Sequence, residues 1–221
     1  MAERPMGALA LYEALLRAYG EPRWWSEDAY TVLFQSVLVQ NTAWGNVEKT
    51  CAAIGEHLKP EVIGELSPEE LEALIRPCGF CRGKARAIRA LTAWFGKYGF
   101  ERQNAAGVST EELREELLAI RGVGAETADV ILVYAFFRPS FIVDAYTRRL
   151  LGRLGHNFAD DAAIKEFFEG ALPRDARVYG HFHWLILEHC IGACRKAARC
   201  EGCVLNGACM AYTKNAPPTG R

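Results

Sequence analysis

Apolar residues recur along this chain at the spacing of three and four positions that places them on one face of an α-helix. The pattern is clear over residues 71–75 and again over residues 113–120. Each stretch follows a serine with a glutamate three positions later, at Ser67 and at Ser109, which is typical of a helix N-terminus. Alternation typical of strands is absent from the sequence. The pattern therefore predicts an all-α fold.

A glycine turn opens one of the apolar helices. Gly122 and Gly124 flank Val123, and both glycines tolerate positive φ, so consecutive backbone N–H groups can point outward. The helix that follows points the positive end of its dipole in the same direction as these N–H groups. A DNA phosphate could bind at such a positive site. The same turn also joins many helix pairs for packing reasons alone. The turn is therefore a candidate anion site and not by itself a functional assignment.

Cysteines gather near the C-terminus with the spacing C-x5-C-x2-C-x5-C. They are Cys194, Cys200, Cys203 and Cys209. Four clustered thiolates suit either a tetrahedral zinc ion or a 4Fe-4S cluster, and this chemistry alone does not choose between them. Cys78 and Cys81 form a C-x-x-C pair, but the βαβ neighbourhood of a redox motif is missing. We interpret His181, His183 and His189 as packing residues of an apolar helix.

Composition limits how the chain can reach a nucleic acid. Its 221 residues, half of them hydrophobic, suffice for one globular unit or two small lobes. The formal charge of −1 gives no general attraction to DNA, so a DNA-binding surface must be local. Candidate basic residues, each of which also suits a solvated helix face, are Arg82, Lys84, Arg86, Arg89, Arg148, Arg149 and Arg153. No apolar run would span a bilayer and the N-terminus does not resemble a signal peptide, so we expect a cytoplasmic protein. A monomer is the default expectation.

The run LLAIRGVGAETADVILVYAFFRPSFIVDAYTRRLLGRLG, which begins at Leu117, resembles the helix-hairpin-helix DNA glycosylases of the endonuclease III superfamily. The resemblance implies two helical lobes with the active site in the cleft between them. Residues 23–136 would form a six-helix barrel closed by the hairpin. Residues 1–22 and 137–221 would form the second lobe, which carries the cysteine loop.

The resemblance also implies roles for individual residues. Asp144 in Val143-Asp144 matches the family's essential carboxylate, which stabilises positive charge on the deoxyribose as the base departs. The role of a helix N-cap is compatible with this assignment. The residues expected to contact DNA are Gln40, Phe80, Gly122, Val123, Gly124, Thr127 and Arg149. Among them, Gln40 and Phe80 match side chains that enter the duplex when the damaged base is flipped out.

In the cysteine loop the resemblance favours the iron–sulfur cluster over zinc. Glycosylases of this superfamily often carry a 4Fe-4S cluster with the spacing C-x6-C-x2-C-x5-C. The first gap of this chain is one residue shorter. Cys194 is the preferred first ligand because the remaining gaps then fit, and Cys190 is the alternative.

Glu126 is a departure from the family pattern. Bifunctional members have a lysine in this place, in Gly-Val-Gly-x-Lys-Thr-Ala, and the lysine attacks the sugar as a Schiff-base nucleophile. A carboxylate cannot form an imine, so the sequence predicts base removal without strand cleavage. Another lysine, such as Lys84, could in principle substitute.

The segments PRWW, VLVQNTAW, GVGAETAD and VDAYTRRL look like those of bacterial 3-methyladenine DNA glycosylases. The resemblance implies a base pocket formed by Trp24, Trp25, Trp44, Glu126 and Tyr146. Indole faces attract a cationic alkylated purine by contacts worth roughly 0.5 to 2 kcal/mol. We therefore expect a monofunctional DNA glycosylase of base excision repair that removes 3-methyladenine or a similar base from double-stranded DNA.

Three other functions stay open at this point. A uracil or thymine mismatch glycosylase would use the same hairpin and aspartate with a different pocket. A glycosylase with lyase activity of the endonuclease III type is disfavoured by Glu126. A DNA-binding iron–sulfur module without catalysis would need no carboxylate beside DNA, so Asp144 argues against it.

Overall fold

A computed structural model describes residues 5–215 of the chain and the side chains as far as residue 212. The described residues form α-helices joined by short 3₁₀ and π segments and contain no strand, so the predicted all-α fold is confirmed. The chain divides into two compact units. One contains the chain as far as Trp24 together with everything from Ser140 onward, and the other is Trp25–Pro139. None of the helices within residues 5–215 is both long and apolar enough to cross a membrane.

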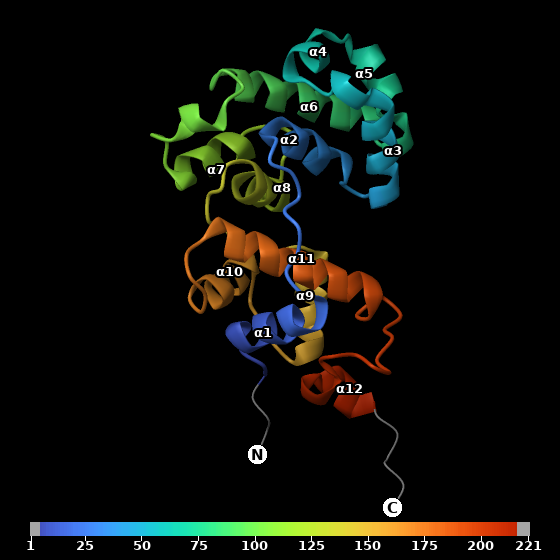
Figure 1. Ribbon diagram of the computed structural model, residues 1–221, viewed down its shortest axis with the longest axis vertical. Helices are drawn as coiled ribbons and strands as arrows, with labels where there is room; N and C mark the ends of the chain where they lie inside the picture. Colours follow the sequence, from blue (N-terminus) through green and yellow to red (C-terminus); the bar gives the residue numbers. More distant parts are fainter. Residues whose placement is uncertain (1–4, 216–221) are drawn as a thin grey trace, which may run out of the picture. The chain divides into compact units, whose positions relative to one another are not determined.

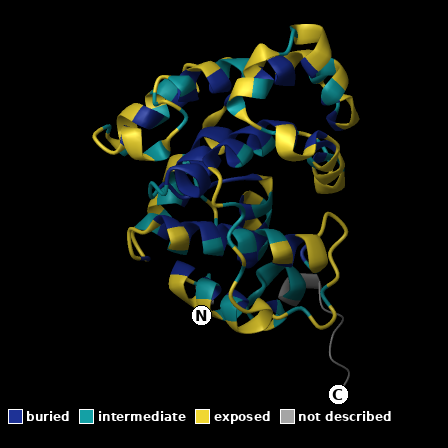
Figure 2. Ribbon diagram, turned by 45° about the horizontal axis from the view of Figure 1, so that its top comes forward, coloured by how far each residue is buried: buried dark blue, intermediate teal, exposed yellow. Residues whose placement is uncertain are grey.

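The unit Trp25–Pro139 is built around one buried helix. Its helices are α2 (Ala29–Leu38), α3 (Trp44–Ile54), α4 (Pro60–Glu65), α5 (Pro68–Leu74), α6 (Cys81–Gly96), α7 (Thr110–Leu118) and α8 (Ala125–Val130). Short 3₁₀ turns are η1 (Gly55–His57), η2 (Arg76–Cys78) and η3 (Arg102–Ala105), and η4 (Ile131–Ala135) is a π-helical continuation of α8. Helix α2 packs against α6, α8 and η4, and most of its side chains are buried (Figures 1 and 2).

Local sequence explains where these helices begin. Ser67 and Ser109 form the two predicted capping boxes, with Glu70 and Glu112 returning the hydrogen bond to the cap residue, so both predicted helix starts are confirmed. Asp28 caps α2 by accepting a hydrogen bond from the backbone N–H of Thr31. A polar cap at each start satisfies an N–H group that the helix itself leaves without a partner.

The other unit joins the first helix of the chain to its last ones. Its helices are α1 (Ala8–Tyr19), α9 (Ala145–Leu154), α10 (Asp161–Glu169), α11 (Ala176–Gly192) and α12 (Met210–Asn215), with a 3₁₀ turn η5 (Asn206–Ala208). Helix α11 packs against α1 and α9, as Figure 1 shows. The core contains Phe141 stacked on Phe168 at 3.9 Å between ring centroids, with Phe182 in edge contact with both.

The cysteine loop ends against α9. Gly155 follows α9 with φ of +95°, and the Met210 side chain of α12 occupies the place that a side chain at Gly155 would need. Only glycine satisfies both requirements, since left-handed backbone disfavours a Cβ and no space remains for one. The end of the loop is therefore fixed to the helix that Asp144 begins.

Candidate functional site

Asp144 is the N-cap of α9 and is 5% exposed. Its Oδ1 accepts a hydrogen bond of 2.7 Å from the backbone N–H of Thr147, and its Oδ2 lies 3.5 Å from Nε2 of His183 on α11. The cap predicted from the sequence is thus present. Both carboxylate oxygens are held by the same unit of the chain, which fixes the orientation of the side chain.

The surroundings of Asp144 favour its charged form. Burial raises the pKa of this carboxyl, but the His183 imidazole and the Thr147 N–H oppose burial. The net result is a pKa below the usual value of an aspartate. A carboxylate that is buried and ionised can stabilise a developing positive charge, because few water molecules are present to screen it.

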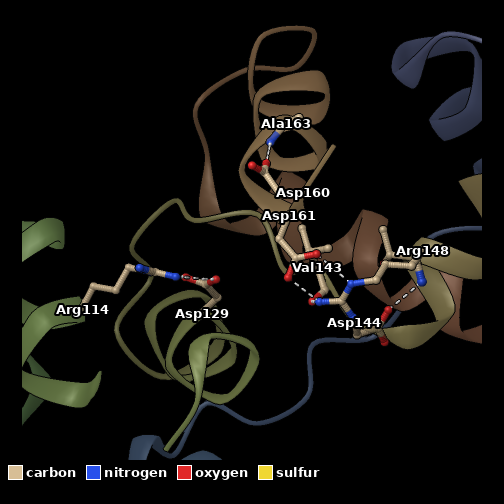
Figure 3. A network of polar contacts seen from close by, with 9 residues as sticks. Arg114, Asp129, Val143, Asp144, Arg148, Asp160, Asp161 and Ala163 are labelled. Atoms are coloured by element: carbon tan, nitrogen blue, oxygen red, sulfur yellow. Dashed lines mark hydrogen bonds and ion pairs between the residues drawn. The ribbon is translucent and has the colours of Figure 1, made fainter. Parts of the chain in front are cut away.

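Two arginines follow Asp144 on α9, and both have partners within their own unit. Arg148 donates from Nε to Oδ1 of Asp161 at 2.7 Å, and its guanidinium also contacts the Val143 carbonyl, as Figure 3 shows beside Asp144. Arg149 donates to the Cys194 carbonyl at 2.9 Å and lies 4.9 Å above the Tyr146 ring. The predicted site residue Arg149 therefore also holds the start of the cysteine loop, and its guanidinium lies on the ring of Tyr146.

The hairpin joins α7 and α8. Gly122 adopts φ of +99°, whereas Gly124 is extended and caps α8. Only the first of the two glycines therefore uses the positive φ that both tolerate. A Cβ at Gly122 would lie 2.9 Å from Cβ of Ala87 on α6, so the close approach of the hairpin to α6 also requires glycine. Val123 is buried beneath the turn.

Gln40 lies at the hairpin rather than free in solvent. Its Nε2 donates to the Gly122 carbonyl at 3.1 Å and to Oγ1 of Thr127 at 2.9 Å. Three of the predicted DNA contacts are thus brought together by direct hydrogen bonds. Phe80 precedes α6 with φ of +51° and is 75% exposed, which is unusual for a phenylalanine.

The predicted aromatic pocket is only partly assembled within one unit. Trp25 lies edge-on to Trp44 at 5.5 Å and to Tyr134 at 5.3 Å, and its Nε1 donates to Oε1 of Gln35 at 2.6 Å. Trp24 belongs to the other unit, where its ring contacts His181 and lies under Arg177. Sequence reasoning missed Tyr134 because its apolar run indicates only a core helix.

Glu126 and Lys84 differ sharply in accessibility. Glu126 is exposed in the first turn of α8. Lys84 is 4% exposed, and its Nζ donates to the carbonyls of Leu38 and Cys78 at 2.8 Å each. Burial lowers the pKa of Lys84, and the neighbouring thiols of Cys78 and Cys81 oppose this shift. The Lys84 ammonium is therefore enclosed and held by two carbonyls.

The cysteine loop is organised by Arg153 of α9. One guanidinium nitrogen lies 3.1 Å from Sγ of Cys194, and the same group donates to the Arg195 and Lys196 carbonyls. The thiol of Cys190 is the main cause that places the pKa of Cys194 well below its usual value, and burial opposes it; His189 and Arg153 lower it further. Cys194 is therefore suited to be the thiolate of the pair.

Two histidines have contacts that the sequence did not indicate. His183 faces Asp144, as described above. Nδ1 of His189 shares a hydrogen bond of 2.9 Å with the Tyr19 hydroxyl. The other ring nitrogen of His189 lies 3.8 Å from Sγ of Cys203. Interpreting these two histidines as packing residues was thus incomplete. No local sequence signal could have found these contacts. Asp144 lies 39 positions from His183, and Cys203 lies 14 positions from His189.

Comparisons with known proteins agree with the resemblance. The sequence pattern of the HhH-GPD superfamily base excision DNA repair proteins matches residues 34–173. A provisionally named DNA repair glycosylase of Methanocaldococcus jannaschii is 43% identical over 207 residues, which cover 90% of this chain and 94% of the relative.

Solved structures of the same fold include a DNA glycosylase and an endonuclease III. The 3-methyladenine DNA glycosylase of H. pylori bound to 1,N6-ethenoadenine gives a TM-score of 0.70 at 25% identity, covering 83% of this chain and 96% of its own. An endonuclease III trapped covalently on DNA gives a TM-score of 0.77 at 24% identity. The match covers 92% of this chain and 94% of the endonuclease III chain. The second likeness supports the fold alone.

Proposed function

Because this chain belongs to the HhH-GPD superfamily of base excision DNA repair proteins, we propose that it is a monofunctional DNA glycosylase for alkylated purines such as 3-methyladenine. The observation that carries this proposal is Asp144, a buried carboxylate held by Thr147 and His183 in its ionised form. In hydrolysis of an N-glycosidic bond, positive charge develops on the deoxyribose as the base leaves. Asp144 stabilises that charge and accepts a proton from the attacking water.

Base removal without strand cleavage follows from the residues that surround the hairpin. Glu126 stands where a lysine would be needed to form an imine with the sugar. Lys84, the alternative amine considered from the sequence, is buried and engaged with two carbonyls. Water is therefore the nucleophile in the proposed reaction.

The choice of an alkylated purine rests on the aromatic side chains. Trp25, Trp44 and Tyr134 form one group of rings, and Trp44 remains 39% exposed. Electron-rich ring faces attract a flipped base that carries positive charge. Such a base is already a good leaving group, which agrees with the absence of an evident general acid among the predicted site residues. Glu126 lies in the same unit as these rings, and the assignment of Trp24 and Tyr146 to the pocket stays a prediction from the sequence.

We propose that double-stranded DNA is held by the hairpin and by the segments that carry Gln40 and Phe80. The backbone of Gly122 and Gly124 approaches a phosphate, with Thr127 as polar support through Gln40. A DNA contact by Arg149 of the other unit stays a prediction from the sequence. Gln40 and Phe80 enter the duplex where the damaged base is flipped out. The exposure of Phe80, at 75%, supports this role because no packing reason accounts for it.

The loop of Cys194, Cys200, Cys203 and Cys209 is proposed to hold a 4Fe-4S cluster. Four thiolates suit either a zinc ion or a cluster, and the resemblance of the C-x5-C-x2-C-x5-C spacing to that of superfamily members with a cluster favours the cluster. When bound, the cluster would fix the loop that carries Arg195, Lys196 and Arg199.

Cys194, rather than Cys190, is the proposed first ligand of the cluster. The thiolate is the form of cysteine that binds metal, and the Arg153 guanidinium 3.1 Å from Sγ of Cys194 stabilises a thiolate there. Cys190 is 1% exposed within α11, and its thiol contacts the Tyr146 carbonyl. Cys194 lies beyond the end of that helix, at the start of the loop.

Base release from methylated duplex DNA tests the proposal. Uracil-containing, thymine-mismatch and abasic duplexes are assayed in parallel, with borohydride trapping to detect an imine. We expect release of 3-methyladenine and no trapped adduct. Activity on only the uracil or mismatch duplexes would reassign the pocket and refute the alkylpurine substrate. Silence on every substrate, with binding retained, would instead favour a DNA-binding module.

A further inference from the structure

Lys84 is a buried cation that the proposed reaction does not use. It is 4% exposed, and its ammonium donates to the Leu38 and Cys78 carbonyls at 2.8 Å each. Burying an ammonium is unfavourable unless its hydrogen bonds are made within the protein. An apolar side chain of similar length would avoid that cost. The position therefore calls for a reason beyond filling space.

The two carbonyls that Lys84 joins lie at the ends of two separate elements. Leu38 is the last residue of α2, and Cys78 is the last residue of η2. Carbonyls at the end of a helix lack partners within the helix, and a cation there also complements the helix dipole. Gln40 follows Leu38 by two residues, and Phe80 follows Cys78 by two. A single ammonium thus ties together the supports of both segments proposed to enter DNA.

Both of these segments contain strained backbone. Asn41 has φ of +53° and Phe80 has φ of +51°. Left-handed backbone is unfavourable for a phenylalanine and less so for an asparagine, and at a bulky residue it persists only when the surroundings impose it. Phe80 is too exposed for packing to hold it. Local backbone bonds such as Gln40 N–H to Val37 and Cys78 N–H to Ile75 hold each segment by itself. The two bonds from the Lys84 ammonium join one segment to the other.

Helix α6 connects this tether to the hairpin. Lys84 and Ala87 lie one turn apart on α6, and Ala87 is the residue that Gly122 approaches. Gln40 in turn donates to the Gly122 carbonyl. The hairpin, the Gln40 segment and the Phe80 segment therefore share one support within the unit Trp25–Pro139.

We propose that Lys84 is a positioning residue that holds the Gln40 and Phe80 segments at a fixed separation, ready to enter the duplex together. The inference rests on the proposed DNA glycosylase function. Its consequence is that the cost of ordering these segments is met before DNA binds, so more of the binding free energy remains to flip the base.

The first test uses the free protein. Lys84→Met keeps the side-chain length and removes the donors, and Lys97→Met removes an exposed lysine at the other end of the same helix as a control. Hydrogen exchange should become at least tenfold faster in residues 39–43 and 79–83 of Lys84→Met and stay unchanged in the control. Parental exchange in a folded Lys84→Met protein would overturn the proposal. If that variant does not fold, Lys84→Gln, which keeps one donor group, replaces it and should show a smaller increase.

The second test measures base flipping with 2-aminopurine beside the lesion. Lys84→Met should lower the flipping equilibrium about tenfold on a paired lesion, and a lesion in a bulge should restore most of the loss because its base is already unstacked. A general structural defect would lower both equally and would count against the proposal. The slope of affinity against salt should not change, whereas loss of a phosphate contact would reduce it by about one.

These two tests separate the tether from the function on which it rests. A parent protein that neither flips nor releases a base would refute the proposed glycosylase. The exchange experiment would still decide whether Lys84 restrains the two segments. Faster exchange together with normal flipping would show that the restraint has no part in DNA distortion, and it would overturn the proposal.

Discussion

Replacing Asp144 by asparagine separates the two tasks of this side chain. Asparagine caps helices about as well as aspartate, so the hydrogen bond from the Thr147 N–H is retained. The variant loses the negative charge beside His183. In the proposed reaction this charge is the one that stabilises the substrate's developing positive charge. The variant therefore tests charge while leaving the start of α9 in place.

The expected loss of transition-state stabilisation exceeds the expected loss of folding stability. Removing one preorganised electrostatic group from an active site costs about 100- to 1,000-fold in rate, or roughly 3 to 4 kcal/mol. The contact that the variant weakens is the one with His183, and losing a hydrogen bond to a charged group costs about 1.5 to 3 kcal/mol of the free energy of unfolding. For a protein of this size, that corresponds to a melting temperature lower by roughly 3 to 12 °C.

The pH dependence of stability provides an independent check. The folded-state pKa of Asp144 lies below its ordinary value, so the ionised carboxylate stabilises the folded state. That contribution is fully present above the unfolded pKa of about 3.9 and is lost as the pH falls through the lower folded-state pKa. The difference in stability between the parent and Asp144→Asn should therefore be constant near neutral pH and shrink in strong acid.

Single-turnover base release, lesion binding and thermal unfolding are the measurements. Asp160→Asn is a matched control, because Asp160 caps α10 through the Ala163 N–H in the same way but at an exposed position, as Figure 3 shows. We expect parental rates for the control. The reasoning is refuted if folded Asp144→Asn binds the lesion normally and keeps more than a tenth of the parental rate.

Three further predictions concern neighbouring residues. His183→Gln should raise the pKa of Asp144, so the acid limb of the pH–rate profile should move to higher pH, and an unmoved limb would exclude the imidazole as a cause. Glu126→Lys should create an adduct that borohydride traps on abasic DNA, because it places a primary amine at an exposed position of α8; trapping by the parent would contradict the assignment. The purified parent should be brown with iron bound, and a colourless parent with stoichiometric zinc would count against the cluster. Cys203→Ala should lose its colour and its solubility before it loses base-release activity. A soluble and fully active Cys203→Ala protein would count against a structural role of the cluster.

Several elements of the fold could be predicted because their signals are local. The capping boxes at Ser67 and Ser109 involve residues three positions apart, so the sequence contains both partners. The N-cap role of Asp144 follows from the same kind of short-range contact. The positive φ of Gly122 is likewise local, although the reason that no other residue fits is the distant Ala87.

Other features depend on residues that are far apart along the chain. Gln40 bonds the hairpin across 82 positions, and Trp25 meets Tyr134 across the whole length of its unit. Helical periodicity reports which face of a helix is apolar and not which helix covers it, so such pairs are not visible in the sequence. For the same reason the sequence predicted that Lys84 lies on the surface. In the structure its side chain is buried between two helix ends.

The sequence by itself determined the all-α fold, the starts of the capped helices, the glycine turn, the spacing of the cysteines and the absence of a lysine at position 126. These depend on intrinsic backbone preferences and on neighbours within one or two helical turns. Tertiary structure alone decided that His183 faces Asp144, that Cys194 rather than Cys190 lies outside α11, and that Lys84 is enclosed. Burial and electrostatic environment arise only when distant segments pack, and they set the charge state and accessibility on which the chemistry depends.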